Sequence, residues 1–381
     1  MSYVNLFPAI LLAGPPHTGK SVFAYHCSIS LKKDQVQFIL LRTTPDGEGD
    51  WFLEAEKGVG MALRQEQKGE FTPQLVERAV SAVRNRSLPM LVDVGGRPQG
   101  DQFRILRACT HSILLYRTDA ERTQWQAWLD ETGLIPIAAL RSELDGQDQI
   151  TSKTGPLQGI ISGLDRFNPR LGSTFTRTMA HIRGIFDYPP SMIQERHLMA
   201  APQGALVITV SNLARTLEVP QDERGHWWSP AHLPSVIRRL PSGKSIALYG
   251  RGPAWIYAAI AAHTAPAPFY LFDARHFGWM PLPPIILNSH EPDPDIRFSE
   301  EMKTDTLRLK IKSQSRFLIP RSIYLPPLSP ASTIILDGKA PLWLTSALTR
   351  ALMAQFSHIA LYDPRLPEPV VVWKKNRHYR K

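Results

Sequence analysis

A six-residue segment occurs twice in the C-terminal half of the chain, and this repetition is the strongest constraint on its fold. The first cassette is Gly250-Arg251-Gly252-Pro-Ala-Trp255, and the second cassette is Gly338-Lys339-Ala-Pro-Leu-Trp343. After each one, a helix-length stretch and an apolar run lead to an Asp-x-Arg, which is Asp273-Ala-Arg275 or Asp363-Pro-Arg365. The two tryptophans are 88 positions apart and the two aspartates 90. A duplicated domain is therefore predicted, and such pairs commonly bind a ligand between them.

The N-terminal part carries a glycine-rich loop between a predicted strand and a predicted helix. The apolar run 9–13 ends in Gly14-Pro-Pro-His17-Thr18-Gly19-Lys20-Ser21, and the stretch 22–31 is helix-like. This order matches the Walker A phosphate-binding loop, although a simple glycine turn before a core helix is the alternative. Backbone N–H groups of the loop would bind phosphate oxygens. We therefore predict that this whole loop binds ATP, with Lys20 on the β- and γ-phosphates and Ser21 on Mg²⁺.

Apolar runs alternate with helix-length segments through the rest of this N-terminal part. They lie at residues 38–41, 89–92, 112–116 and 136–140. This alternation is typical of a parallel α/β sheet covered by helices. The polar, glycine- and serine-rich stretch 145–175 predicts loops, and 176–186 predicts a helix. Tyr188-Pro-Pro190 breaks the helical pattern, so we place the end of a P-loop NTPase domain at residue 190.

Asp93 ends the apolar run Leu91-Val92-Asp93 at the sheet edge where the phosphate loop is expected. It is a Walker B candidate that would bind Mg²⁺ at the nucleotide site. The competing interpretation is an aspartate that only caps the following Gly95-Gly96 turn. From the residues alone, both interpretations stay open.

Composition excludes several classes of protein. The 381 residues are 43% apolar and 20% charged, as in ordinary globular proteins of two or three domains. No apolar stretch approaches the roughly 20 residues that span a bilayer, and no signal peptide is expected. Cys27 and Cys109 are the only cysteines, which favours a reducing cytoplasm. The net charge of +10 favours an anionic partner such as a nucleotide or RNA.

The duplicated half predicts two tandem small α/β domains, 200–298 and 299–381. Each copy is expected to open with a strand, at 205–210 or 306–311, and to close with a strand, at 284–287 or 370–373. Taken singly, the motifs have plain structural explanations, because Trp255 and Trp343 suit a core and an Asp-x-Arg often forms a local ion pair. Their joint recurrence at matched spacing favours a shared function.

Residues 200–375 resemble the small CRISPR-associated ring nucleases of type III systems. Hallmarks of that family are Gly-Arg-x-Pro-x-Trp-Leu, a helix ending in histidine, Asp-Pro-Arg-Leu, and a last strand ending in Ser-His. The resemblance implies α/β domains distantly related to the CRISPR-associated Rossmann fold. It also implies dimers that sandwich cyclic tetra-adenylate and cut it with help from Mn²⁺, which switches off the CRISPR signal. Some family members are fused to an ATPase-like (AAA-like) domain, as the P-loop half would be here.

The first copy keeps more of these hallmarks than the second. It departs from them at Ala274, where the family has proline, at about six extra residues after the arginine, and at a helix histidine one position out of register. The resemblance implies that Asp273 and His290 bind Mn²⁺ and that the cassette glycines contact the ring. The residues for which it implies catalytic roles are Arg251, His263, Asp273 and Arg275.

The second copy is expected to bind the ring without cutting it. Lys339 replaces the cassette arginine, Arg350 stands near the helix histidine, and Lys375 replaces the terminal histidine. Together with Asp363 and Arg365, these side chains would supply charge to a tetra-anionic ring. A lopsided site follows, in a cytoplasmic homo-oligomer without membrane contact.

Two alternatives to a ring nuclease remain open from the sequence. One is an NTPase effector or sensor that is gated by a cyclic oligoadenylate and does not cut it. The other is a P-loop kinase without a CRISPR role. The insert His226-Trp-Trp-Ser-Pro230 is either a partner-facing loop or a folded lid.

Overall fold

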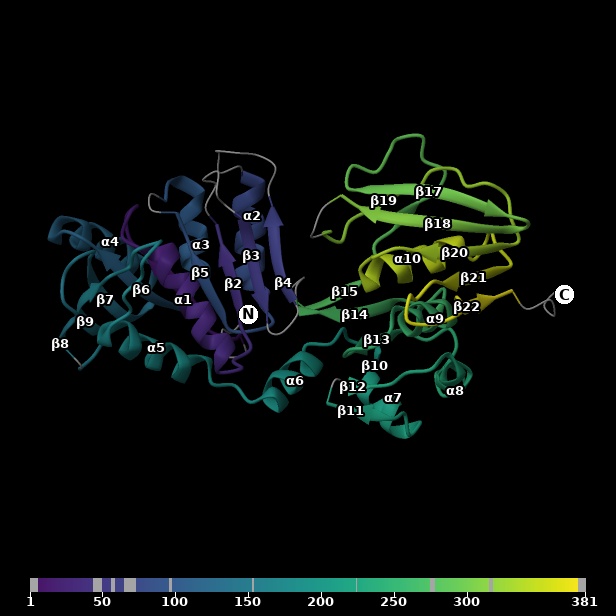
Figure 1. Ribbon diagram of the computed structural model, residues 1–381, viewed down its shortest axis with the longest axis horizontal. Coiled ribbons are helices and arrows are strands. Elements are labelled where there is room, and N and C mark those ends of the chain that lie inside the picture. Colours follow the sequence, from purple (N-terminus) through teal and green to yellow (C-terminus); the bar gives the residue numbers. More distant parts are fainter. Residues whose placement is uncertain are drawn as a thin grey trace. The chain divides into compact units, whose positions relative to one another are not determined.

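A computed structural model describes residues 6–43, 50–55, 59–64, 73–95, 98–152, 154–223, 225–274, 278–314 and 318–375 (Figure 1). The chain divides into two compact units, Met1–His197 and Leu198–Lys381. Among the described helices, none is both long enough and apolar enough to cross a membrane.

Unit 1 is built on a seven-stranded sheet in the order β2-β5-β1-β6-β7-β9-β8. Strand β1 (Ala9–Ala13) lies between β5 (Met90–Asp93) and β6 (His111–Tyr116) and is parallel to both. Strands β2 (Ile39–Arg42) and β7 (Ile135–Glu143) continue the parallel order outward. Every residue of β1 is fully buried because helices cover both faces of the sheet. The predicted parallel α/β sheet is thus confirmed.

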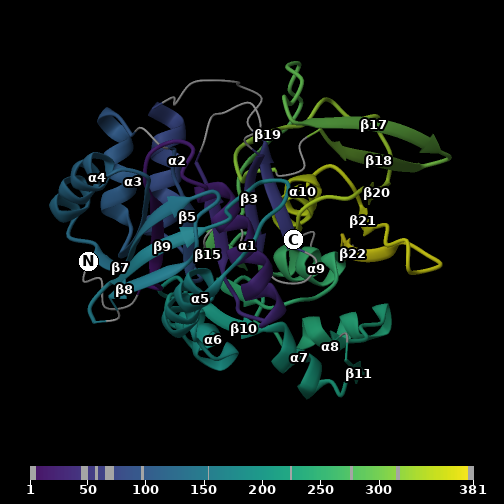
Figure 2. The same cartoon turned by 60° about the vertical axis from the view of Figure 1, so that its left-hand side comes forward.

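The helices of unit 1 form two layers (Figures 1 and 2). Helices α1 (Lys20–Lys33) and α5 (Ser173–Phe186) contact each other on one face of the sheet. Helices α2 (Pro73–Arg84), α3 (Phe103–Ala108) and α4 (Asp119–Thr132) contact one another in sequence on the other face. The remaining elements of the unit are β3 (Asp50–Ala55), β4 (Val59–Arg64), η2 (Gly100–Gln102) and α6 (Pro190–Met199).

The predicted loop stretch 145–175 contains two strands that the sequence pattern did not indicate. They are β8 (Gln149–Ser152) and β9 (Leu157–Ser162), and β9 pairs in parallel with β7. A Cβ atom at Gly159 would lie 2.0 Å from the carbonyl oxygen of Gln149. This glycine therefore permits the close approach of β8 and does not mark a loop.

The two copies in unit 2 form sheets with the same order and strand directions. The first is β10 (Leu206–Thr209), β13 (Ile246–Tyr249), β14 (Phe269–Asp273) and β15 (Gly278–Pro281). The second is β18 (Thr306–Ser313), β20 (Thr333–Asp337), β21 (His358–Leu361) and β22 (Val370–Lys374), with β17 (Ile296–Lys303) added beside β18. In each, the first three of these strands are parallel and the last is antiparallel.

Each cassette is the corner between a strand and a buried helix. Helix α9 (Ala254–Thr264) follows β13, helix α10 (Leu342–Leu352) follows β20, and each begins after a proline. The two helices pack against each other (Figure 2). Trp255 and Trp343 are 1% and 0% exposed. Because residues of both sheets join one hydrophobic cluster, the copies share a core. The predicted division at 298/299 falls inside β17.

The first copy closes differently from the prediction. Its last strand is β15, and only the short β16 (Ile285–Ile286) forms within 284–287, where it pairs with β19 (Ile323–Tyr324). Strand β14 is already paired with β13 on one side and β15 on the other, so neither of its edges is available to this segment. The connecting elements of the unit are α7 (Val210–Thr216), β11 (Gln221–Asp222), β12 (Gly225–His226), η3 (Pro230–His232) and α8 (Leu233–Arg238).

The cassette glycines predict a difference in stability between two alanine variants. Both have positive φ, 112° at Gly250 and 143° at Gly338, which costs a side chain about 1–3 kcal/mol. An added Cβ at Gly338 would also lie 2.1 Å from the carbonyl oxygen of Ile311, whereas at Gly250 the nearest atom is 3.6 Å away. Gly338→Ala should therefore lower the thermal midpoint more than Gly250→Ala, as followed by circular dichroism. Equal midpoints would contradict the close approach to β18.

Candidate functional site

The Walker A segment of unit 1 forms a tight loop between β1 and α1. Gly14 and Gly19 have φ of 133° and 79°. A Cβ at Gly14 would lie 1.9 Å from the carbonyl oxygen of Leu115, and one at Gly19 would lie 2.7 Å from Cβ of Leu164. Only glycine fits both positions, because backbone and side-chain atoms of neighbouring segments occupy the space. The loop thus has the P-loop-like geometry of strand, turn and helix N-terminus.

The polar side chains of this loop lie beside Asp93 from the adjacent strand β5. The Nζ of Lys20 donates to the carbonyl oxygens of Gly14 and Pro15, at 2.7 and 2.6 Å. The hydroxyl of Ser21 donates to Oδ2 of Asp93 at 3.1 Å. The hydroxyl of Thr18 donates to the carbonyl oxygen of Pro15 at 3.0 Å. Gly14, His17, Thr18, Gly19, Lys20, Ser21 and Asp93 are therefore brought together as the sequence analysis expected.

Asp93 fits the role of a Mg²⁺ partner. The residue is fully buried, and its Oδ1 has no hydrogen-bond partner among the described residues. Burial raises the pKa of this carboxyl, while Lys20, Arg42 and the Ser21 hydroxyl act in the opposite direction. A buried carboxylate oxygen without a partner, next to a serine hydroxyl, is a donor set that Mg²⁺ prefers. Its carboxylate accepts a hydrogen bond from Ser21, a contact that an aspartate capping the Gly95-Gly96 turn would not need.

Replacing Asp93 by asparagine should stabilise the nucleotide-free protein. Because the folded-state pKa is raised, ionisation of Asp93 costs stability as pH rises above about 3.8, and the cost persists at neutral pH. The amide of the Asp93→Asn variant would keep an oxygen for Ser21 without the buried charge. Chemical denaturation of both proteins at pH 7 and at pH 3.5 measures the difference in their free energies of unfolding. The variant should exceed wild type by more at pH 7 than at pH 3.5. A variant less stable than wild type at pH 7 would contradict the direction of the pKa shift.

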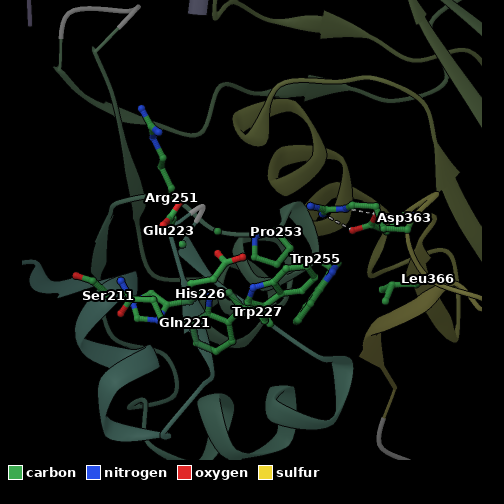
Figure 3. A pocket seen from close by; sticks show the side chains of 15 residues that line it. Ser211, Gln221, Glu223, His226, Trp227, Arg251, Pro253, Trp255, Asp363 and Leu366 are labelled. Carbon is green, nitrogen blue, oxygen red and sulfur yellow. Dashed lines mark hydrogen bonds and ion pairs between the residues drawn. The ribbon is translucent and has the colours of Figure 1, made fainter. Parts of the chain in front are cut away.

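Unit 2 contains a pocket to which both copies contribute (Figure 3). Its volume is about 750 Å³. The first cassette supplies Arg251, Gly252, Pro253 and Trp255, and the second copy supplies Asp363, Arg365 and Leu366. The third wall is the hairpin of β11 and β12, continued by two tryptophans. Ser211 and the hairpin residues Gln221, Asp222, Glu223, Gly225, His226, Trp227 and Trp228 complete the lining.

Asp363 holds Arg365 in place at this pocket. Its carboxylate accepts from Nε and Nη2 of Arg365 at 2.9 and 2.7 Å, drawn as dashed lines in Figure 3. The bond from Arg365 is the first cause that holds the pKa of Asp363 below its usual range. Trp255, from the other copy, also acts to lower the pKa of this carboxyl. The Asp363 side chain is 11% exposed and that of Arg365 is 74% exposed, so the pair presents a guanidinium to the pocket.

His263 and Arg350 lie elsewhere in unit 2. His263 is eight residues after Trp255, about 12 Å further along α9. Its Nε2 is 2.9 Å from the carbonyl oxygen of Leu240. The guanidinium of Arg350 donates to Ala261 and Thr264 at the same end of α9. Burial lowers the pKa of Arg350 to about 10. Neither lines the pocket, because both sit at the C-terminal ends of α9 and α10.

The other predicted ring-binding and metal-binding residues are dispersed. Asp273 ends β14 and is half-buried, Lys339 is exposed in the second cassette, and His290 is exposed on the loop after β16. Arg275 lies outside the described residues. Within the described ranges, no group of three or more His, Cys, Asp or Glu side chains is placed to hold a metal ion. His290 was expected at the end of the last strand of the first sheet. Because β15 is that last strand, His290 instead follows β16, which belongs to another sheet.

The sequence analysis missed the contribution of the hairpin. The sequence pattern indicated no role for Glu223 or Gln221. For the adjacent Trp227-Trp228 pair it allowed either a lid or a partner-facing loop. The unusual run of two tryptophans among turn residues was the available signal. Its place beside the first cassette depends on the fold, since α7 turns the chain back across the end of β13.

Comparisons with known proteins give one distant solved structure and one family match. A solved structure titled "Crystal Structure of molybdopterin-guanine biosynthesis protein B (mobB)" is 14% identical, over 47% of this chain and 99% of that one, at a TM-score of 0.24. The P-loop-like α/β fold of unit 1 therefore rests on its own strand order and loop geometry.

Residues 314–381 match the family described as CRISPR-associated protein (Cas_csx3). This segment contains the second cassette, α10 and Asp363-Pro-Arg365. The match supports a CRISPR-associated protein. No curated protein matches the chain.

Proposed function

We propose that unit 2 binds cyclic tetra-adenylate at the pocket between its two copies and cleaves it, so that type III CRISPR signalling is switched off. One observation carries the proposal. The first cassette and the Asp-Pro-Arg of the second copy, which both belong to the hallmarks of the ring nucleases, line the same pocket. Unit 1 would bind Mg·ATP through Lys20, Ser21 and Asp93.

The pocket offers cations to an anionic ring. Arg251 is exposed and makes no hydrogen bond or ion pair with another described residue. Arg365 keeps guanidinium N–H groups outside its bonds to Asp363. Arginine is suited to phosphate because its planar fork presents several donors at once. Both side chains would bind phosphate groups of the ring.

Cleavage would need a second chain. The pocket lies at the carboxyl ends of the parallel strands, whereas His263 lies at the opposite end of α9. A ring held by one chain would meet a histidine when a second chain stacks its α9 and α10 C-termini over the pocket. Such a contact joins two different surfaces and is therefore head-to-tail. This arrangement fits the expected homo-oligomer that sandwiches the ring.

The chemistry would use side chains of both chains. His263 would take the proton of a 2′-hydroxyl or of a water, whose oxygen then attacks phosphorus. The bond to the leaving oxygen breaks as the new bond forms, and the leaving oxygen takes a proton from solvent. Arg251 would neutralise charge on the phosphate. Mn²⁺ fits this pocket poorly, because both oxygens of Asp363 are bonded to Arg365. The proposed cleavage step therefore uses side chains and no metal ion in this pocket.

A second function has one observation in its favour. The nucleotide-site residues of unit 1 lie together within a single chain, whereas His263 lies apart from the pocket. A cyclic-oligoadenylate-gated NTPase, which binds the ring without cutting it, would need only these features.

Labelled cyclic tetra-adenylate, incubated with the full chain with and without Mn²⁺ and ATP, distinguishes the two functions. Linear products that disappear in His263→Ala, and persist in the matched control His181→Ala, would support cleavage. Intact ring that stimulates ATP hydrolysis would support gating. Absence of binding would refute both.

A further inference from the structure

We infer that residues 221–223 and 225–228 form an adenine-binding wall that orients one nucleotide of the ring in the pocket. This inference rests on the proposed function, since it assigns a recognition role within the same pocket. It goes beyond that function because no hallmark of the resembling family lies in this segment.

Trp227 provides a surface for stacking. Its side chain belongs to the pocket lining, yet the residue is 60% exposed, which is unusual for so large an apolar group. The hairpin base holds it in position, because the backbone N–H of Trp227 donates to the carbonyl oxygen of Pro220 at 2.7 Å. Figure 3 shows Trp227 and Trp255 within the same pocket. Exposed indoles on a pocket wall are platforms on which bases stack.

Two buried polar atoms of the wall have no partner among the described residues. They are Nδ1 of His226 and Nε1 of Trp228. Trp228 also packs against the hydrophobic core and lies edge-on to His232, with ring centroids 5.9 Å apart. Leaving such atoms without hydrogen bonds is costly. The wall is therefore not fully hydrogen-bonded by its own contacts within the described residues.

The pocket is lined by side chains of both charges. Glu223 is exposed on the hairpin, whereas Arg251 and Arg365 come from the cassette and the second copy. A carboxylate only accepts hydrogen bonds, so it favours a base with an amino group and repels a carbonyl oxygen. Adenine has an exocyclic amino group at the position where hypoxanthine has a carbonyl. A base whose amino group bonds to Glu223 would therefore be favoured, while Arg251 and Arg365 would bind phosphates of the ring.

The wall makes the site one-sided. In the second copy, the described residues between β18 and β20 form only the two-residue β19, which pairs with β16. A ring in the pocket would thus have one of its bases stacked on Trp227. The lopsidedness expected from the cassette residues would then also apply to recognition of the bases.

Binding of two labelled rings by the full chain tests the inference. The probes are cyclic tetra-adenylate and a cyclic tetramer of inosine. Wild type should prefer the adenine ring, Trp227→Ala should weaken its binding by about five- to a hundredfold, and Trp227→Phe should restore most of it. Glu223→Gln should reduce the preference for adenine over inosine. Phe167→Ala, which removes a 91% exposed aromatic in unit 1, is the control.

Failure of the adenine wall and failure of ring binding give different results. If the adenine ring binds wild type and Trp227→Ala equally, with unchanged preference in Glu223→Gln, the wall is refuted and ring binding stands. If neither ring binds wild type, the proposed function fails first. Circular dichroism of each variant identifies a folding defect, and Trp227→Phe then decides because it keeps an aromatic ring at this position.

Discussion

An equimolar mixture of Arg251→Ala and His263→Ala chains should cleave cyclic tetra-adenylate at about a quarter of the wild-type rate, although each variant alone is nearly inactive. Each loss alone should be about 10²- to 10⁴-fold, the range for removing an acid–base group. The reason is the position of the two residues at opposite ends of α9. In a head-to-tail stack, each site takes Arg251 from one chain and His263 from the next. Random mixing leaves both intact in about one site of four.

Product formation against the mixing ratio measures this complementation. The rate should peak at equal amounts and fall towards either pure variant. A mixture no faster than the average of its components would contradict a site shared by two chains. A mixture of Arg251→Ala with Arg365→Ala is the matched control, because both residues line the same pocket and no interface would regain a complete set.

Lys20→Ala should weaken Mg·ATP binding by at least roughly a hundredfold, about 3 kcal/mol. In the structure, the Nζ of Lys20 bonds to the carbonyl oxygens of Gly14 and Pro15 at the mouth of the loop. Bound phosphate would take over these bonds and add a negative charge opposite the ammonium, which a carbonyl oxygen does not carry. Isothermal titration calorimetry with ATP and Mg²⁺ measures the loss.

Lys33→Ala is the control for this experiment, because Lys33 lies in the last turn of the same helix. Equal affinities in the two variants would contradict a phosphate site at the loop. The same titration repeated with cyclic tetra-adenylate present tests coupling between the units. Coupling must be reciprocal, so ATP should then change the affinity for the ring by the same factor.

Much of unit 1 could be predicted because its signals are local. The phosphate-loop motif joins a strand to a helix within a few residues, and Asp93 directly ends a buried strand. The prediction of loops over 145–175 was wrong at β8 and β9, where Gly159 is typical of a loop but lies in a strand. A close strand approach and a flexible loop both select glycine, and only the neighbour's position distinguishes them.

By itself, the sequence determined the duplication in unit 2, since each strand, glycine corner and buried tryptophan depends on residues near in the chain. The tertiary structure alone decided which residues share a pocket. Asp363 lines the same pocket as Trp255 of the other copy, and Gln221 of the hairpin lines it too. The separation of His263 from Arg251, in contrast, already follows from the sequence, because a helix carries residues apart by a fixed rise. Contacts between distant segments depend on how two copies pack, which no local pattern encodes.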